Sequence, residues 1–109
     1  MNHPLNALQF IANASGEIEN YKHLIANADT YSRAKEKAAF ALGYIECMIT
    51  FLNTAIHRDN NNFTGELSDV IDNWMASIYQ SLANKAIATE QDNDIVLELL
   101  KRRDYHLAD

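Results

Sequence analysis

The stretch from residue 38 to residue 56, AAFALGYIECMITFLNTAI, is apolar on almost every side of a helix. Glu46 is its only formal charge, and Gly43 is the residue that weakens the helical pattern. Such a helix has to be covered on several sides, by its own chain, by another subunit or by lipid. Glu46 near its centre would cost about 3 kcal/mol in a bilayer. We therefore expect a helix buried in protein and no membrane span.

The rest of the chain also favours helices. Its 109 residues include 3 glycines and 1 proline, and strands would need more turn residues than that. We expect one all-α domain over residues 1–109, a four-helix, mainly antiparallel bundle. The helices are predicted at about 4–28, 30–57, 66–86 and 92–103. The first two should form a long hairpin, because the link between them is short.

Apolar residues repeat at alternating spacings of four and three in the first segment, which is typical of a helix seam. The seam consists of Ala7, Ile11, Ala14, Ile18, Tyr21, Ile25 and Ala28. Asp29 or Thr30 is expected to cap the second helix. The last residues, DYHLAD, are expected to fray.

The second segment carries three apolar stripes, more than the other helices of one chain can cover. One stripe consists of Phe40, Tyr44, Cys47 and Phe51. We expect these residues to form an oligomer interface, with a homodimer favoured. Cys47 alone cannot make an internal disulfide, which indicates a small core residue in an intracellular, cytoplasmic protein.

Four of the nine lysines and arginines gather around the tip of the predicted hairpin, although the net charge of the chain is −6. They are Lys22, Arg33, Lys35 and Lys37. A helix N-terminus offers free N–H groups, so these cations are candidates for binding a phosphate or another anion. The alternative is a solvated tip in which Asp29 and Glu36 balance the charge, and we favour it because no glycine-rich loop accompanies the cations.

Acidic residues dominate the second half of the chain. They include Glu66, Asp69, Asp72, Glu90, Asp92 and Asp94. These carboxylates could form a surface for a basic protein partner, or they could serve only as helix caps and solvated charges. The negative charge argues against direct binding to nucleic acid.

One segment, GELSDVID at residues 65–72, is similar to the ExxD element of the all-helical MazG-type nucleotide pyrophosphohydrolases. In that family carboxylates on adjacent helices hold magnesium, so the resemblance implies a metal role for Glu66 and Asp69. The preceding ExxE element of the family is missing, since Ile49 stands three residues after Glu46. A metal-dependent hydrolase is therefore the third interpretation.

A second segment, FALGYIECMITFLNTAI at residues 40–56, is similar to the long second helix of small phage proteins that sequester cyclic-nucleotide immune signals. The similar positions are Ala41, Ile45, Glu46, Asn53, Ala55 and Ile56. The N-terminal ligand-contacting residues of that family have no counterpart here, so no site is transferred. The resemblance implies a small accessory protein of a phage or mobile element.

No catalytic constellation or metal motif stands out, so we expect no enzyme activity and no cofactor. The leading interpretation is a small acidic module for protein–protein interaction. It would act as an inhibitor or adaptor of phage type by binding a host protein. The alternative is a module that binds a nucleotide or another phosphate at the basic hairpin tip.

Overall fold

The computed structural model describes the backbone of residues 7–59 and 64–108, and the side chains of residue 9 and of residues 11–51 and 68–108. Four helices follow one another along the chain: α1 (Ala7–Ala26), α2 (Tyr31–Asp59), α3 (Thr64–Ala88) and α4 (Asn93–Leu107). All regular structure in these residues is helical, and the predicted all-α bundle is confirmed.

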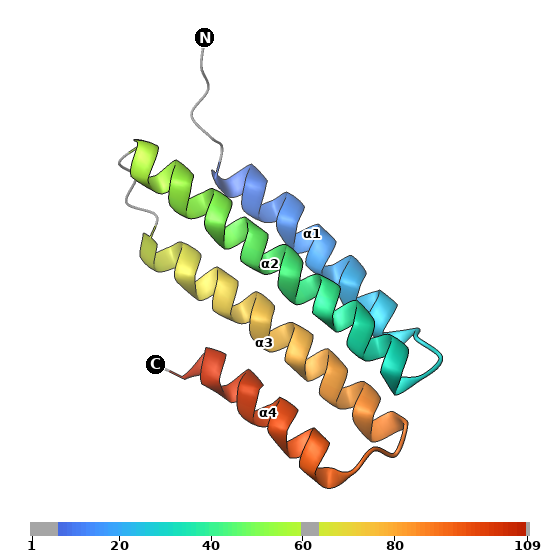
Figure 1. Cartoon of the computed structure of the whole chain (residues 1–109). Helices are drawn as coiled ribbons and strands as arrows, with labels where there is room; N and C mark the ends of the chain where they lie inside the picture. Colours follow the sequence, from blue (N-terminus) through green and yellow to red (C-terminus); the bar gives the residue numbers. More distant parts are fainter. Residues whose placement is uncertain (1–6, 60–63, 109) are drawn as a thin grey trace.

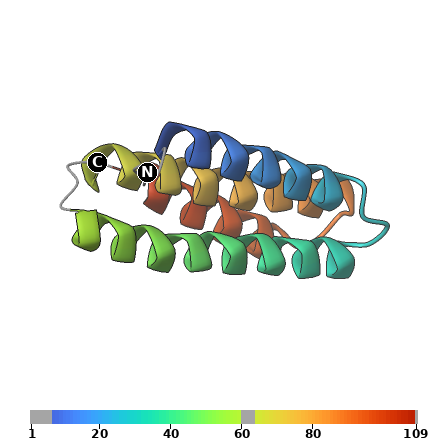
Figure 2. The same ribbon diagram turned by 90° about the horizontal axis from the view of Figure 1, so that it is seen from above.

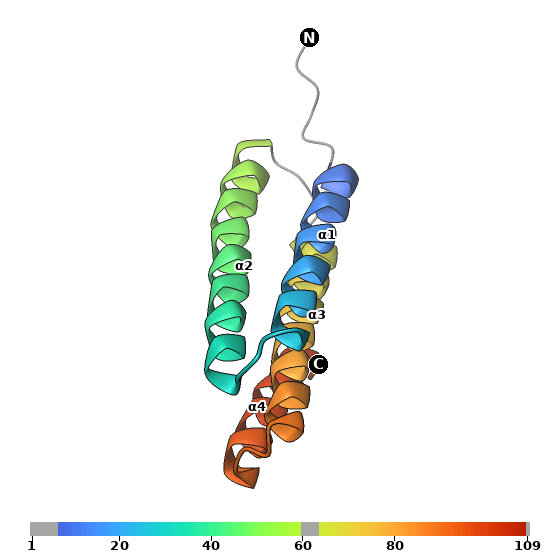
Figure 3. The ribbon, with the colours of Figure 1, turned by 90° about the vertical axis from the view of Figure 1, so that its right-hand side faces the viewer.

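The helices run alternately up and down, and the α1–α2 and α3–α4 turns lie at the same end of the molecule (Figure 1). The first three helices pack against one another in every pair. By contrast, α4 contacts only α3 within the described chain. Figures 2 and 3 show that α2 lies on one side of the bundle, with α1 and α3 side by side opposite it. The molecule is long and flat, with extents of 53 × 28 × 16 Å.

The core lies where α1, α2 and α3 meet, and Leu99 of α4 belongs to the same cluster. Among the described side chains of α2, which end at Phe51, the buried ones are Ala34, Ala38, Ala41 and Ile45. Three of these four are alanines, and small side chains allow short distances between helix axes. The largest fully buried side chains in the described residues are Ile18 and Ile25 of α1, Ile45 of α2 and Ile78 of α3. None of the buried side chains in the described residues is polar or charged.

Two helix ends are closed by side chains from the chain itself. Thr30 caps α2, because its Oγ1 accepts a hydrogen bond from the Arg33 N–H at 3.2 Å. Lys85 Nζ on α3 donates to the Ala26 carbonyl at 3.0 Å, at the C-terminal end of α1, where carbonyls lack helical partners. Both contacts hold the α1–α2 turn at the end of the bundle shown at lower right in Figure 1.

The prediction that the C-terminal tail frays is wrong, because α4 continues to Leu107. The side chain that holds this last turn is His106. Its ring stacks on Tyr79 of α3 with centroids 5.8 Å apart. Its Nδ1 lies 3.0 Å from Asp72 Oδ1. These contacts to a neighbouring helix supply the packing energy that a short helix end lacks on its own.

The apolar segment at residues 38–56 lies within α2, as expected. Among the described residues, no helix has the length and apolar character needed to cross a membrane.

Candidate functional site

The face of α2 that points away from the bundle is almost free of charge. The exposed residues between positions 39 and 51 are Ala39, Phe40, Gly43, Glu46, Cys47, Thr50 and Phe51. Glu46 is the single charged residue among them, whereas the solvent face of a helix is normally polar. We call these seven residues the outward face of α2.

The predicted interface stripe divides between this outward face and the bundle. Phe40 is 57% exposed and Phe51 is 51% exposed. Cys47 is also exposed, so the expectation that it is a core residue is wrong for the single chain. Tyr44 is half-buried, and its ring centroid lies 5.9 Å from that of Tyr21 on α1. Burial, and then the charge of the nearby Glu17 and the Tyr21 hydroxyl, raise the pKa of Tyr44.

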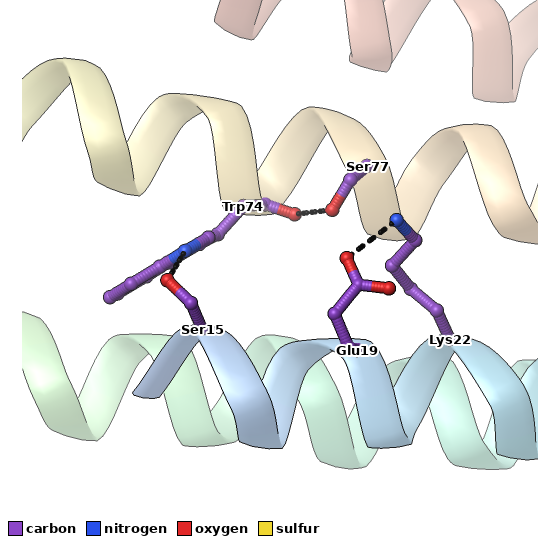
Figure 4. Close-up of polar contacts among 5 residues, drawn as sticks. All are labelled: Ser15, Glu19, Lys22, Trp74 and Ser77. Carbon is purple, nitrogen blue, oxygen red and sulfur yellow. Dashed lines mark hydrogen bonds and ion pairs between the residues drawn. The ribbon is translucent and has the colours of Figure 1, made fainter. Parts of the chain in front are cut away.

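The four cations of the predicted anion site lie at the same end of the bundle but do not converge. Lys22 Nζ pairs with Glu19 Oε1 at 3.0 Å (Figure 4). Lys35 Nζ lies 5.8 Å from the centroid of the Tyr31 ring, and Lys37 Nζ lies 6.0 Å from that of Phe40. Arg33 and Lys35, two residues apart on α2, point in nearly opposite directions, because each residue turns a helix by about 100°. The anion site stays a prediction, and this geometry adds nothing to it.

The predicted acidic surface forms two separate groups. Asp69 and Asp72 lie in the first half of α3, and the Glu66 side chain lies outside the described side chains. The other group surrounds the α3–α4 turn, where Glu90, Asp92 and Asp94 are all exposed. From Asp72 to the end of α3 the helical rise alone is about 24 Å, so one small partner site cannot include both groups.

A surface cleft of about 350 Å³ lies between Tyr79 of α3 and the C-terminal part of α4. It is lined by Tyr79, Glu98, Lys101, Arg102, Tyr105 and His106. Arg102 pairs with Glu98 on the surface, with its Nε 3.2 Å from Glu98 Oε1. Interactions with the Tyr79 hydroxyl, and then with Glu98, raise the pKa of Arg102.

This cleft was missed from the sequence because the tail was expected to fray. Tyr105 and His106, which form part of its wall, belong to that tail. One signal could have found them. Leu99, Arg103 and His106 continue the apolar side of α4 at spacings of four and three, and all three are buried or half-buried in the structure.

Metal binding finds no additional support in the described residues. No group of three or more His, Cys, Asp or Glu side chains there could hold a metal ion. Of the ExxD-like segment, Asp69 is exposed and Asp72 contacts His106. The metal interpretation of Glu66 concerns a side chain outside the described set.

Comparison with known proteins gave no match among protein families, curated proteins or solved structures.

Proposed function

We propose that this chain is a non-enzymatic interaction protein that pairs with a second copy of itself through the outward face of α2. The main evidence is the composition of that face, where six of the seven exposed residues between positions 39 and 51 are uncharged. Phe40 alone leaves 57% of its surface in water. Covering such residues would remove apolar area from solvent, which is the main driving force of protein association.

The spacing of the outward face supports a second copy as the partner. Ala39, Gly43, Glu46 and Thr50 follow one another at spacings of four, three and four, and Phe40, Cys47 and Phe51 form the parallel stripe. This is the periodicity of two helices packed along their length. In a symmetric dimer this same face of both copies would be buried.

Gly43 gives independent support. A Cβ at this position would meet nothing within 4 Å, so the chain's own packing does not require glycine there. Glycine inside a helix costs about 1 kcal/mol relative to alanine. Close approach of a second helix backbone would account for it.

Sedimentation velocity tests the pairing. We expect a species of twice the 12.3 kDa chain mass at concentrations of about 10 to 100 μM, a range suited to weak dimers. Phe40→Asp should give a folded monomer, because the side chain is exposed in the single chain. The matched control is Leu97→Asp, at a 62% exposed apolar position on α4, which should leave the dimer intact. A wild-type monomer throughout the range would disprove the pairing.

We also propose that a partner protein binds to the acidic group at the α3–α4 turn. Its three members, Glu90, Asp92 and Asp94, lie within five residues of one another and are exposed. A compact group of this sign favours a basic surface and speeds the encounter with it. An inhibitor or adaptor would use such a surface to bind its partner. The resemblance of residues 40–56 to phage sequestering proteins favours a small accessory protein of a phage or mobile element.

Charge reversal tests this contact in a pull-down from the native host. The Asp92→Lys, Asp94→Lys double variant should lose a partner that wild type retains. The control is Asp69→Lys, an exposed acid in the other group. Equal capture by wild type and both variants would exclude the acidic turn as the contact.

A further inference from the structure

We propose that the cleft between α3 and α4 binds a small anion carried on a planar aromatic ring, such as an aryl phosphate. The cleft volume of about 350 Å³ falls within the range of small-ligand sites. Its lining combines three aromatic side chains with two basic side chains and one carboxylate. This inference is independent of the α2 pairing, since α2 and α4 do not touch in the described chain.

The rings on one side of the cleft are already ordered. Tyr79 and His106 stack with an interplanar angle of 12°, and Tyr105 meets His106 edge-on at 85° with centroids 5.3 Å apart. Tyr105 nevertheless remains 78% exposed. A flat ring that packs against Tyr105 would bury this aromatic surface in the offset or edge-on geometry that aromatic pairs prefer.

The basic side chains of the cleft would recognise the anionic group of the ligand. Arg102 pairs with Glu98, with its Nε 3.2 Å from Glu98 Oε1, and both side chains are more than half exposed. Lys101 is exposed, and no hydrogen bond or ion pair within the described part of the chain engages it. The Lys101 ammonium and the Arg102 guanidinium line the same cleft, and together they match a phosphate, which accepts several charge-assisted hydrogen bonds. The cleft is thus locally cationic in a chain of net charge −6.

Titration of ¹⁵N-labelled protein with phenyl phosphate, followed by amide chemical shifts, tests the proposal. We expect saturable shifts around Tyr79 and residues 98–106 at ligand concentrations below about 10 mM. Lys101→Ala and Tyr105→Ala should each weaken binding by about fivefold or more, because each removes one of the two recognised features. Both positions are exposed, so the variants should stay folded by circular dichroism.

Two control variants distinguish binding in the cleft from nonspecific binding to positive charge or to the surface of α4. Lys35→Ala removes an exposed cation from α2, and Leu97→Ala removes an exposed apolar side chain from α4 that does not line the cleft. Both should bind phenyl phosphate like wild type. Phenol lacks the anion and inorganic phosphate lacks the ring, so each should bind at least about fivefold more weakly.

Four outcomes would overturn the proposal. The first is the absence of saturable shifts, and the second is unchanged affinity in both cleft variants. The third is affinity for phenol equal to that for phenyl phosphate, which would show that the cations do not contribute. The fourth is equal affinity for inorganic phosphate, which would show that the rings do not contribute.

Discussion

The indole Nε1 of Trp74 donates a hydrogen bond to Ser15 Oγ at 3.2 Å, between residues 59 positions apart in the chain (Figure 4). Trp74 is the one tryptophan of the sequence and is 6% exposed in the core. A buried indole N–H needs a partner, and the hydroxyl on α1 provides it. The bond therefore fixes how far α1 can slide along α3.

Ser15→Ala should lower the free energy of unfolding by about 1 kcal/mol, because it leaves the buried indole N–H without its acceptor. The measurement is urea denaturation followed by circular dichroism. Combined with Trp74→Phe, the same substitution should cost clearly less, since the donor is gone. The control is Ser32→Ala, an exposed serine on α2, which should cost nothing. Equal losses for Ser15→Ala with and without the indole would contradict the assigned role of the bond.

Gly16 and Gly43 form a matched pair for testing the α2 dimer. Both lie inside helices, and a Cβ added to either would meet no other atom within 4 Å. Gly16→Ala should raise the free energy of unfolding by about 1 kcal/mol and leave the dimer dissociation constant unchanged. Gly43→Ala should instead raise that dissociation constant severalfold, because a methyl group would separate the paired helices. Sedimentation equilibrium measures the dissociation constants, and identical behaviour of the two variants would argue against close approach at Gly43.

The fold was predictable because the apolar periodicity shows which side of a helix is buried. Ile18 and Ile25 belong to the predicted seam of the first helix, and both are buried. The position of α4 was less predictable. Its apolar side, with Leu99 at the centre, indicates that it packs somewhere. In the described chain α4 packs only on α3. This depends on the shape of the core formed by the other three helices, which the periodicity of apolar residues does not predict.

A candidate site was predictable only where all of its residues lie on one helix. The exposure of Phe40 and Phe51 follows from the excess of apolar stripes on α2. The α3–α4 cleft depends on Tyr79 and His106, which are brought together by antiparallel packing across 27 positions of sequence. The spacing of residues within one helix does not reveal such a contact between two helices. The division of the predicted acidic surface into two groups was missed for a related reason, because the sequence does not show that the length of α3 separates them.

Glu90 ends α3 in a conformation that suits glycine better. Its φ of 58° lies in the left-handed region, while the Gln91 N–H bonds to the Ala86 carbonyl at 2.9 Å in a Schellman-type helix end. Glu90→Gly should therefore raise the free energy of unfolding by about 1 kcal/mol. Glu36→Gly, inside α2, should lower it by a similar amount. Thermal denaturation compares them, and a loss of stability in Glu90→Gly would contradict the left-handed assignment.

Tyr44 should make the fold sensitive to alkaline pH. Burial raises the pKa of its hydroxyl above the ordinary value of 10.0, with a smaller contribution from Glu17. The unfolded chain then loses this proton at a lower pH than the folded chain does. The resulting stability is complete below pH 10 and is lost as the pH rises through the folded-state pKa.

Urea denaturation at about pH 8 and about pH 11 measures this loss, because the two values lie on either side of the titration. Tyr44→Phe should lose less stability between them than wild type, since phenylalanine has no proton to release. Glu17→Gln should fall between the two, because it removes one of the causes that raise the pKa while leaving burial in place. All other titratable groups are the same in wild type and in Tyr44→Phe. The difference between those two proteins therefore isolates the hydroxyl, and an identical alkaline loss in both would show that Tyr44 does not cause it.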